Sequence, residues 1–244
     1  MKPREIKRQA ANRKRWLSHP FARTVLLIGG LASATFAYSK DFEQRCAAQS
    51  REAHISVVFE NAVPTLIKSK RALDMPHSSD GSPSHRSVGL TEAKLRRHFS
   101  ISLNGTVDSL TGVACGKADI QIRLRYDPFR VYLAAELDGT HCLQQQVLEH
   151  ELIHVRLFNA AAQEAAAQLR IELIAHFSNV TLRGREADVL QEVQSELNRR
   201  WIPRLDELLD QFDEKHVALD FDVKARADRI CPGLFDDISK RIEQ

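Results

Sequence analysis

One short motif carries residues whose types and spacing could perform chemistry. Residues 147–154 read VLEHELIH and contain His150-Glu151-Leu152-Ile153-His154, an H-E-x-x-H sequence. Residues four apart lie on the same face of an α-helix, so both imidazoles can bind one divalent cation. Zinc accepts such nitrogens at about 2.0–2.1 Å. Glu151 then lies beside the ligands, where it can act as a general base toward water, as in a zinc metallopeptidase.

A catalytic zinc requires a third protein ligand and an open position for water. If two long helices form an antiparallel hairpin that turns at Gly184, residues equally far before and after this glycine face each other. His216 then lies opposite the stretch between His150 and His154. We therefore predict His216 as the third metal ligand. The alternatives are Asp213, Glu164 and Glu172.

The elements that must position these side chains are long helices. Residues 143–182 contain neither Pro nor Gly and have an Ala-rich middle, which favours an uninterrupted helix that includes the motif. Gly184 is typical of a helix end. Residues 186–216 form a second expected helix, with a kink at Pro203.

Strand patterns precede the motif. Residues 117–126 and 129–137 each alternate with period two, and Asp127-Pro128 between them is typical of a turn, so we expect a β-hairpin. Residues 91–99 are expected to form a short helix. The predicted fold class is therefore α+β, in which a small antiparallel sheet is followed by the active-site helix and a long antiparallel helical hairpin.

The cysteines predict two disulfide bonds. The chain has four of them, none in a C-x-x-C pair, which gives no indication of a zinc ribbon or a thioredoxin-like site. An even number of cysteines in an oxidising compartment favours disulfides. The expected hairpin brings Cys115 near Cys142. Cys46 would then pair with Cys231.

The N-terminal residues predict export. Residues 1–37 hold eight of the 35 Lys and Arg and one of the 32 acidic residues, and they end in an uncharged apolar run at 24–37. This pattern is typical of a secretory signal, and an uncleaved membrane anchor is the alternative. We expect residues 38–244 to form the metallopeptidase domain, in the periplasm or secreted, with residues 75–87 as a Ser- and Pro-rich loop. An anchored form would be held in the inner membrane.

Charge and composition exclude other classes of protein. The chain is 43% hydrophobic and 27% charged, which is typical of a globular domain and not of a disordered or multi-spanning one. Beyond residue 37, 27 basic residues stand against 31 acidic ones, so the body carries about −4. This charge argues against nucleic acid as a partner.

The combination of these features resembles a known family. A strand with a nearby cysteine, a helix with H-E-x-x-H and a long helix that ends in Asp213-Glu214-Lys215-His216 are similar to the exported bacterial predicted Zn-dependent proteases catalogued as a domain of unknown function. The resemblance covers roughly residues 57–229. It implies a zincin-like peptidase but no particular substrate.

The function expected from the sequence is an exported zinc metallopeptidase with a protein or peptide substrate. Glu151 is its general base, and His150, His154 and His216 hold the metal. Residues 129–137 are expected to offer a strand edge to an extended peptide, with Tyr126 and Tyr132 as candidate oxyanion donors. The alternative is a non-catalytic, disulfide-stabilised interaction module of the cell envelope.

Overall fold

The computed structural model describes residues 42–47, 52–74, 88–220 and 223–242. The predicted leader (1–37) and the predicted loop (75–87) lie outside the described residues. The strands are β1 (His54–Phe59), β2 (Thr65–Lys70), β3 (Gly89–Val107), β4 (Val113–Ala134) and β5 (Leu182–Arg185). The helices are α2 (His141–Phe177), α3 (Glu186–Glu196), α4 (Ile202–Asp210), α5 (Asp213–Asp220), α6 (Val223–Ile230) and α7 (Leu234–Ile242), with short turns η1 (Ala72–Asp74), η2 (Ala135–Leu137) and η3 (Leu197–Trp201). In the part of the chain that is described, no helix is long and apolar enough to cross a membrane.

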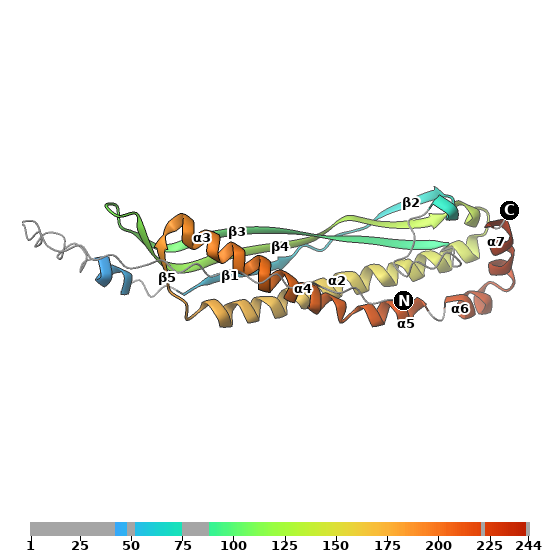
Figure 1. The fold of residues 1–244 in the computed structure, drawn as a ribbon. Helices are drawn as coiled ribbons and strands as arrows, with labels where there is room; N and C mark the ends of the chain where they lie inside the picture. The colour runs from blue at the N-terminus through green and yellow to red at the C-terminus, as the bar shows by residue number, and fades with distance from the viewer. Residues whose placement is uncertain (1–41, 48–51, 75–87, 221–222, 243–244) are drawn as a thin grey trace, which may run out of the picture. The chain divides into compact units, whose positions relative to one another are not determined.

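The described strands form one mixed sheet around β4. β3 pairs antiparallel with nearly the whole length of β4. On its other edge, β4 pairs first with β5, which runs antiparallel to it. It then pairs with β1 and β2, which both run parallel to it. The predicted small antiparallel sheet is therefore wrong, because two of the four pairings are parallel and the central strands are long (Figure 1).

β4 passes straight through Asp127 and Pro128, where the sequence predicted a hairpin turn. The ladder with β3 continues on both sides of the proline and shifts register only between Ala93 and Leu95, opposite this point. Such an irregularity accommodates a residue that has no N–H to donate. Residues 130–134 pair with β2 on one edge and with β3 on the other. The prediction that residues 129–137 offer an open strand edge is therefore wrong.

Residues 91–99 belong to β3 and not to the short helix that was predicted. Leu95 and Phe99 are partly buried against the core, whereas Lys94, Arg96 and His98 between and before them are exposed. This alternation has the period of a strand. Pairing with β4 therefore outweighs the helix-forming tendency of the charged residues in this segment.

Helix α2 covers one face of the sheet. Leu169 and Leu173 of α2 are fully buried in one cluster with Ile120, Ile122 and Leu124 of β4. The long helix that the sequence predicted is thus confirmed, although it ends at Phe177. Helix α4 lies beside α2, and α3 packs against β3 and β5, with residues of both helices in the same core cluster (Figure 1).

The return path after α2 is not the predicted hairpin of two long helices. Gly184 lies in strand β5, which pairs with β4, and is not a turn between helices. The expected second helix runs without a gap from Glu186 to Asp210, and α5 follows after two turn residues, 211 and 212. The π-helical turn η3 separates α3 from α4 within this run. This turn directly precedes Pro203, which lacks the N–H that an unbroken α-helix would need. A strand and a helical run that contains a π-helical turn therefore follow α2 in place of the expected hairpin.

Two disulfide bonds are present, as predicted, but their pairing differs. Cys46 is bonded to Cys115, and Cys142 to Cys231, with Cα–Cα distances of 5.8 and 5.9 Å. The expected Cys115–Cys142 and Cys46–Cys231 bonds depended on the hairpin at Asp127-Pro128. Because β4 is continuous, roughly 60 Å of extended strand separates Cys115 from the end of β4, just before Cys142.

Candidate metal centre

Helix α2 holds the motif rigidly against the sheet. Val147 and Val155, on either side of the motif, are buried in the core. Glu151 and His154 are only 5% and 8% exposed, which is unusual for polar residues, and His150 is partly buried. Burial of this kind fixes the rotamers of the three polar side chains, as a preformed site requires.

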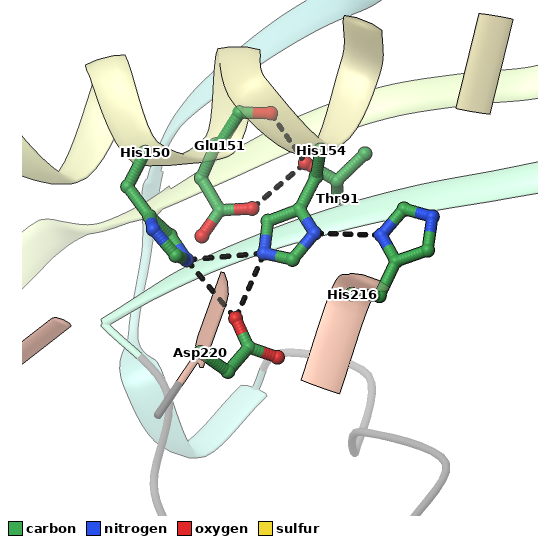
Figure 2. A network of polar contacts seen from close by, with 6 residues as sticks. All are labelled: Thr91, His150, Glu151, His154, His216 and Asp220. Atoms are coloured by element: carbon green, nitrogen blue, oxygen red, sulfur yellow. Dashed lines mark hydrogen bonds and ion pairs between the residues drawn. The ribbon is translucent and has the colours of Figure 1, made fainter. Parts of the chain in front are cut away.

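Three side-chain atoms converge at the motif. The Nε2 atoms of His150 and His154 lie 3.0 Å apart, and the Oδ1 atom of Asp220 lies 3.1 Å from the first and 2.8 Å from the second (Figure 2). Among the described residues, these three form a group that could hold a metal ion. The two Nε2 atoms and the carboxylate oxygen are therefore close enough to one another to bind the same ion.

The donor set fits a small divalent cation. Ligands about 2.0–2.1 Å from a tetrahedral ion lie about 3.3 Å from one another, which is within a few tenths of an ångström of the observed separations. Two nitrogens and one oxygen leave a fourth position open, as in catalytic zinc sites. The geometry thus supports a metal centre with three protein ligands.

Asp220, the last residue of α5, was missed by sequence analysis. It lies one turn after His216, at i+4, so both residues project from the same side of α5. This spacing was the signal that could have found it. The hairpin prediction placed residues near His216 opposite the motif, only a few residues before Asp220. The difference arises because β5 and the π-helical turn η3 make the return path differ from an ideal hairpin.

His216 approaches the motif from the other side of the His154 ring. Its Nδ1 atom lies 2.8 Å from the Nδ1 atom of His154, whereas the Nε2 atom of His154 faces Asp220. The ring of His216 also packs against Phe158, with 4.3 Å between centroids. His216 is thus adjacent to the group, but it contacts the nitrogen of His154 that points away from Asp220 (Figure 2), and its role as a metal ligand stays a prediction.

Strand β3 fixes the carboxylate of Glu151. The Thr91 hydroxyl donates to Oε2 of Glu151 at 2.7 Å and lies 3.2 Å from its backbone carbonyl oxygen. Gly89 leaves space for the other oxygen, because a Cβ at this position would lie 2.6 Å from Oε1 of Glu151 and 2.5 Å from Val147. Neither Gly89 nor Thr91 was predicted as a site residue, since the sequence suggested a helix at 91–99.

Burial raises the pKa of both carboxyl groups of the site, Glu151 and Asp220, whereas hydrogen bonds and the nearby histidines lower it. Burial raises the pKa of Glu151 above its usual value, although the Thr91 hydrogen bond and the two motif histidines oppose this effect. Burial also disfavours the ionised form of Asp220, but hydrogen bonds with His150 and His154 outweigh it and hold the pKa of this carboxyl well below its usual range. Asp220 is thus the acidic group that the surroundings keep ionised.

The other candidate ligands lie away from the converging atoms. Glu172 accepts two hydrogen bonds from the guanidinium of Arg204, at 2.8 and 2.9 Å. Glu164 and Asp213 are exposed and do not belong to the metal-binding group. Of the candidate oxyanion donors, Tyr126 donates its hydroxyl to the carbonyl of Phe158, and Tyr132 donates to Glu92.

Comparison with known proteins identifies no relative. No protein-family model, curated protein or solved structure matches the chain.

Proposed function

We propose that the chain is a zinc-dependent hydrolase that cleaves peptide bonds. The observation that carries this proposal is the convergence of His150 Nε2, His154 Nε2 and Asp220 Oδ1 beside the buried carboxylate of Glu151. A metal-binding group next to a buried acid is the arrangement that metal-assisted hydrolysis requires. The H-E-x-x-H spacing of His150, Glu151 and His154 on one helix supports the same class of reaction.

Each residue of the site has a definite role in this proposal. His150, His154 and Asp220 hold the cation and leave one position open. A zinc ion held by these residues would supply Lewis acidity toward water and toward the carbonyl of the scissile bond. Glu151 accepts a proton from water and delivers it to the leaving amine. Thr91 keeps the Glu151 carboxylate oriented toward this task by donating to Oε2.

We also propose that this hydrolase acts outside the cytoplasm. All four cysteines form disulfides, and such bonds persist in oxidising compartments. The basic stretch and the apolar run that follows it within residues 1–37 also support export. The periplasm or the extracellular space is therefore the expected location.

Metal analysis and two matched glutamine variants test the proposed function. The purified chain should contain about one zinc ion, by the donor count of the site. Glu151→Gln should keep the zinc and lose hydrolysis of a peptide library. Glu149→Gln is the control, because Glu149 is an exposed residue of the same helix whose carboxylate accepts a hydrogen bond from Gln145.

The outcomes separate the enzyme from its rival. A chain without bound metal, or Glu151→Gln with full turnover, contradicts the proposed function. Loss of turnover in Glu151→Gln but not in Glu149→Gln supports it. Metal binding with no hydrolysis by any variant, the wild type included, would favour the non-catalytic envelope module.

A further inference from the structure

Asp220 is held by a helix that has little packing of its own. None of the eight residues of α5 is buried, and the side chain of Asp220 is 61% exposed. By contrast, the two histidines belong to a helix of 37 residues that is packed into the core. Apart from the contacts of His216 with His154 and Phe158, the position of the third ligand therefore depends on what anchors the chain before and after α5.

The anchors lie at the two ends of α5. Before it, Phe212 is buried. After it, Ala227 of α6 is buried in a cluster with Leu143 and Val147 of α2, and Cys231 follows at the end of α6 with only 2% exposure. Asp220 thus lies in the sequence between two buried anchors, Phe212 and Ala227.

The anchor after α5 includes a covalent bond to the helix of the motif. Cys231 is bonded to Cys142, which lies eight residues before His150 on α2, about 12 Å along the helix axis. Asp220 lies eleven residues before Cys231 in the sequence. One disulfide therefore links the helix that contains both histidines to the chain segment that contains Asp220.

We propose that the Cys142–Cys231 disulfide positions Asp220 and so completes the metal centre, an inference that rests on the proposed function. A cross-link restricts the conformations that the linked segment can adopt, which favours the one arrangement in which Oδ1 meets both imidazoles. Without the cross-link, the two histidines stay in place on α2, but the carboxylate is held only by noncovalent packing, that of Phe212, His216 and Ala227.

The proposal makes assembly of the site dependent on redox conditions. When a dithiol reductant attacks, the S–S bond takes up two electrons and two protons and becomes two thiols, while the reductant is oxidised to its own disulfide. The metal centre then loses its positioned carboxylate. A chain that is still in a reducing compartment would therefore bind the metal weakly, and full affinity would arise after export.

The second disulfide provides a matched control. Cys46–Cys115 joins residues 42–47 to β4. Neither of its cysteines lies on α2, α5 or α6. Its removal should lower stability by a similar mechanism, because the two bonds close loops of similar length, 69 and 89 residues. It should leave the metal ligands in position.

The test compares metal affinity in the two double variants. Zinc affinity is measured by competition with a chromogenic chelator, and the ligand field by the visible spectrum of the Co²⁺-loaded protein, while circular dichroism reports folding. We expect Cys142→Ala/Cys231→Ala to bind zinc about 10–100-fold more weakly, the loss typical of a missing supporting contact, with a changed Co²⁺ spectrum. Cys46→Ala/Cys115→Ala should bind zinc as the wild type does.

A mutant cycle shows whether the disulfide acts through Asp220. In an Asp220→Asn background, the removal of Cys142–Cys231 should cause no further loss of zinc affinity, because the ligand that it positions is already gone. An equal loss in both backgrounds, or a wild-type affinity and Co²⁺ spectrum in Cys142→Ala/Cys231→Ala, would overturn the proposal. A wild type that binds no zinc would instead contradict the proposed function.

A second measurement applies if Cys142→Ala/Cys231→Ala does not fold. The folded Cys46→Ala/Cys115→Ala protein, which retains only the Cys142–Cys231 bond, is reduced with a dithiol and then reoxidised. Zinc affinity should fall on reduction and return on reoxidation, and the Co²⁺ spectrum should show no thiolate band. Zinc affinity that does not change through this cycle would exclude the positioning role.

Discussion

The Nδ1 atoms of His154 and His216 lie 2.8 Å apart, in rings whose planes differ by only 5°. An imidazole that offers Nε2 to a cation carries its proton on Nδ1, so His154 can donate this proton to His216. Burial and the neighbouring His154 lower the pKa of His216, which favours the neutral ring that can accept it. Under the proposed function, His216 would therefore favour the tautomer of His154 that leaves Nε2 for the metal.

Two substitutions of His216 distinguish a hydrogen-bond acceptor from a metal ligand. His216→Asn retains an acceptor, so we expect zinc affinity close to that of the wild type. His216→Phe keeps an aromatic ring against Phe158 but removes the acceptor, and it should weaken zinc binding about 10–100-fold. Chelator competition measures both. If both variants lose the metal entirely, His216 is a ligand, as the sequence predicted.

Asp220→Asn should have a larger effect than either substitution of His216. The removal of a charged ligand should lower zinc affinity by more than about 100-fold, beyond the loss typical of a supporting partner. Asp213→Asn is the control, because Asp213 is an exposed acid of the same helix. Zinc titration of the two variants checks the difference. Equal affinity in both would remove Asp220 from the ligand set.

Thr91→Val should affect turnover and not metal binding. The hydroxyl donates to Oε2 of Glu151, and a hydrogen bond to a charged group is worth about 1.5–3 kcal/mol, so we expect kcat to fall about 10-fold or more. Thr91→Ser restores the donor and should restore most of kcat. The measurement is steady-state hydrolysis by zinc-loaded protein. An unchanged kcat in Thr91→Val would show that Thr91 does not orient Glu151.

Glu172 and Arg204 should make stability depend on acidity. Hydrogen bonds from Arg204 hold the pKa of Glu172 below its usual value, although partial burial opposes this. The pair therefore stabilises the fold at pH values above the usual carboxyl pKa of about 4.5, and this contribution disappears as pH falls through the lowered pKa. Glu172→Gln should lower Tm by about 2–4 °C at pH 7, for a loss of about 1 kcal/mol.

Thermal melting of the same proteins at acidic pH checks this prediction. Near pH 3, wild type and Glu172→Gln should melt at temperatures closer together than at pH 7, because protonation has weakened the pair in the wild type. Glu164→Gln, at an exposed position of the same helix, should melt as the wild type does at both pH values. A difference for Glu172→Gln that grows in acid would contradict the assignment.

The helix of the motif could be predicted from sequence because its signals are local. Residues four apart on an Ala-rich segment without Pro or Gly determine both the helix and the common face of His150 and His154. The sheet could not be predicted in the same way. Asp127-Pro128 has the local features of a turn, and only the long-range ladder between β3 and β4 shows that the strand continues there.

Asp220, the third member of the group that could hold a metal, was missed for a geometric reason. An ideal hairpin places His216 opposite the motif, but β5 and the π-helical turn before Pro203 change the path of the return helices by several residues. A turn was also wrongly expected within β4, at Asp127-Pro128, and this led to the wrong disulfide pairing. Local patterns therefore placed His150 and His154 on one face of a helix, whereas the positions of their partners depended on long-range pairing.

Crystals grown with zinc and measured at the zinc absorption edge test the central claim most directly. We predict one anomalous peak about 2.0–2.1 Å from Nε2 of His150, Nε2 of His154 and Oδ1 of Asp220, with Glu151 beside it and not bound to it. A peak bonded to His216 in place of Asp220 would contradict the ligand set. No peak at the motif would contradict the metal centre itself.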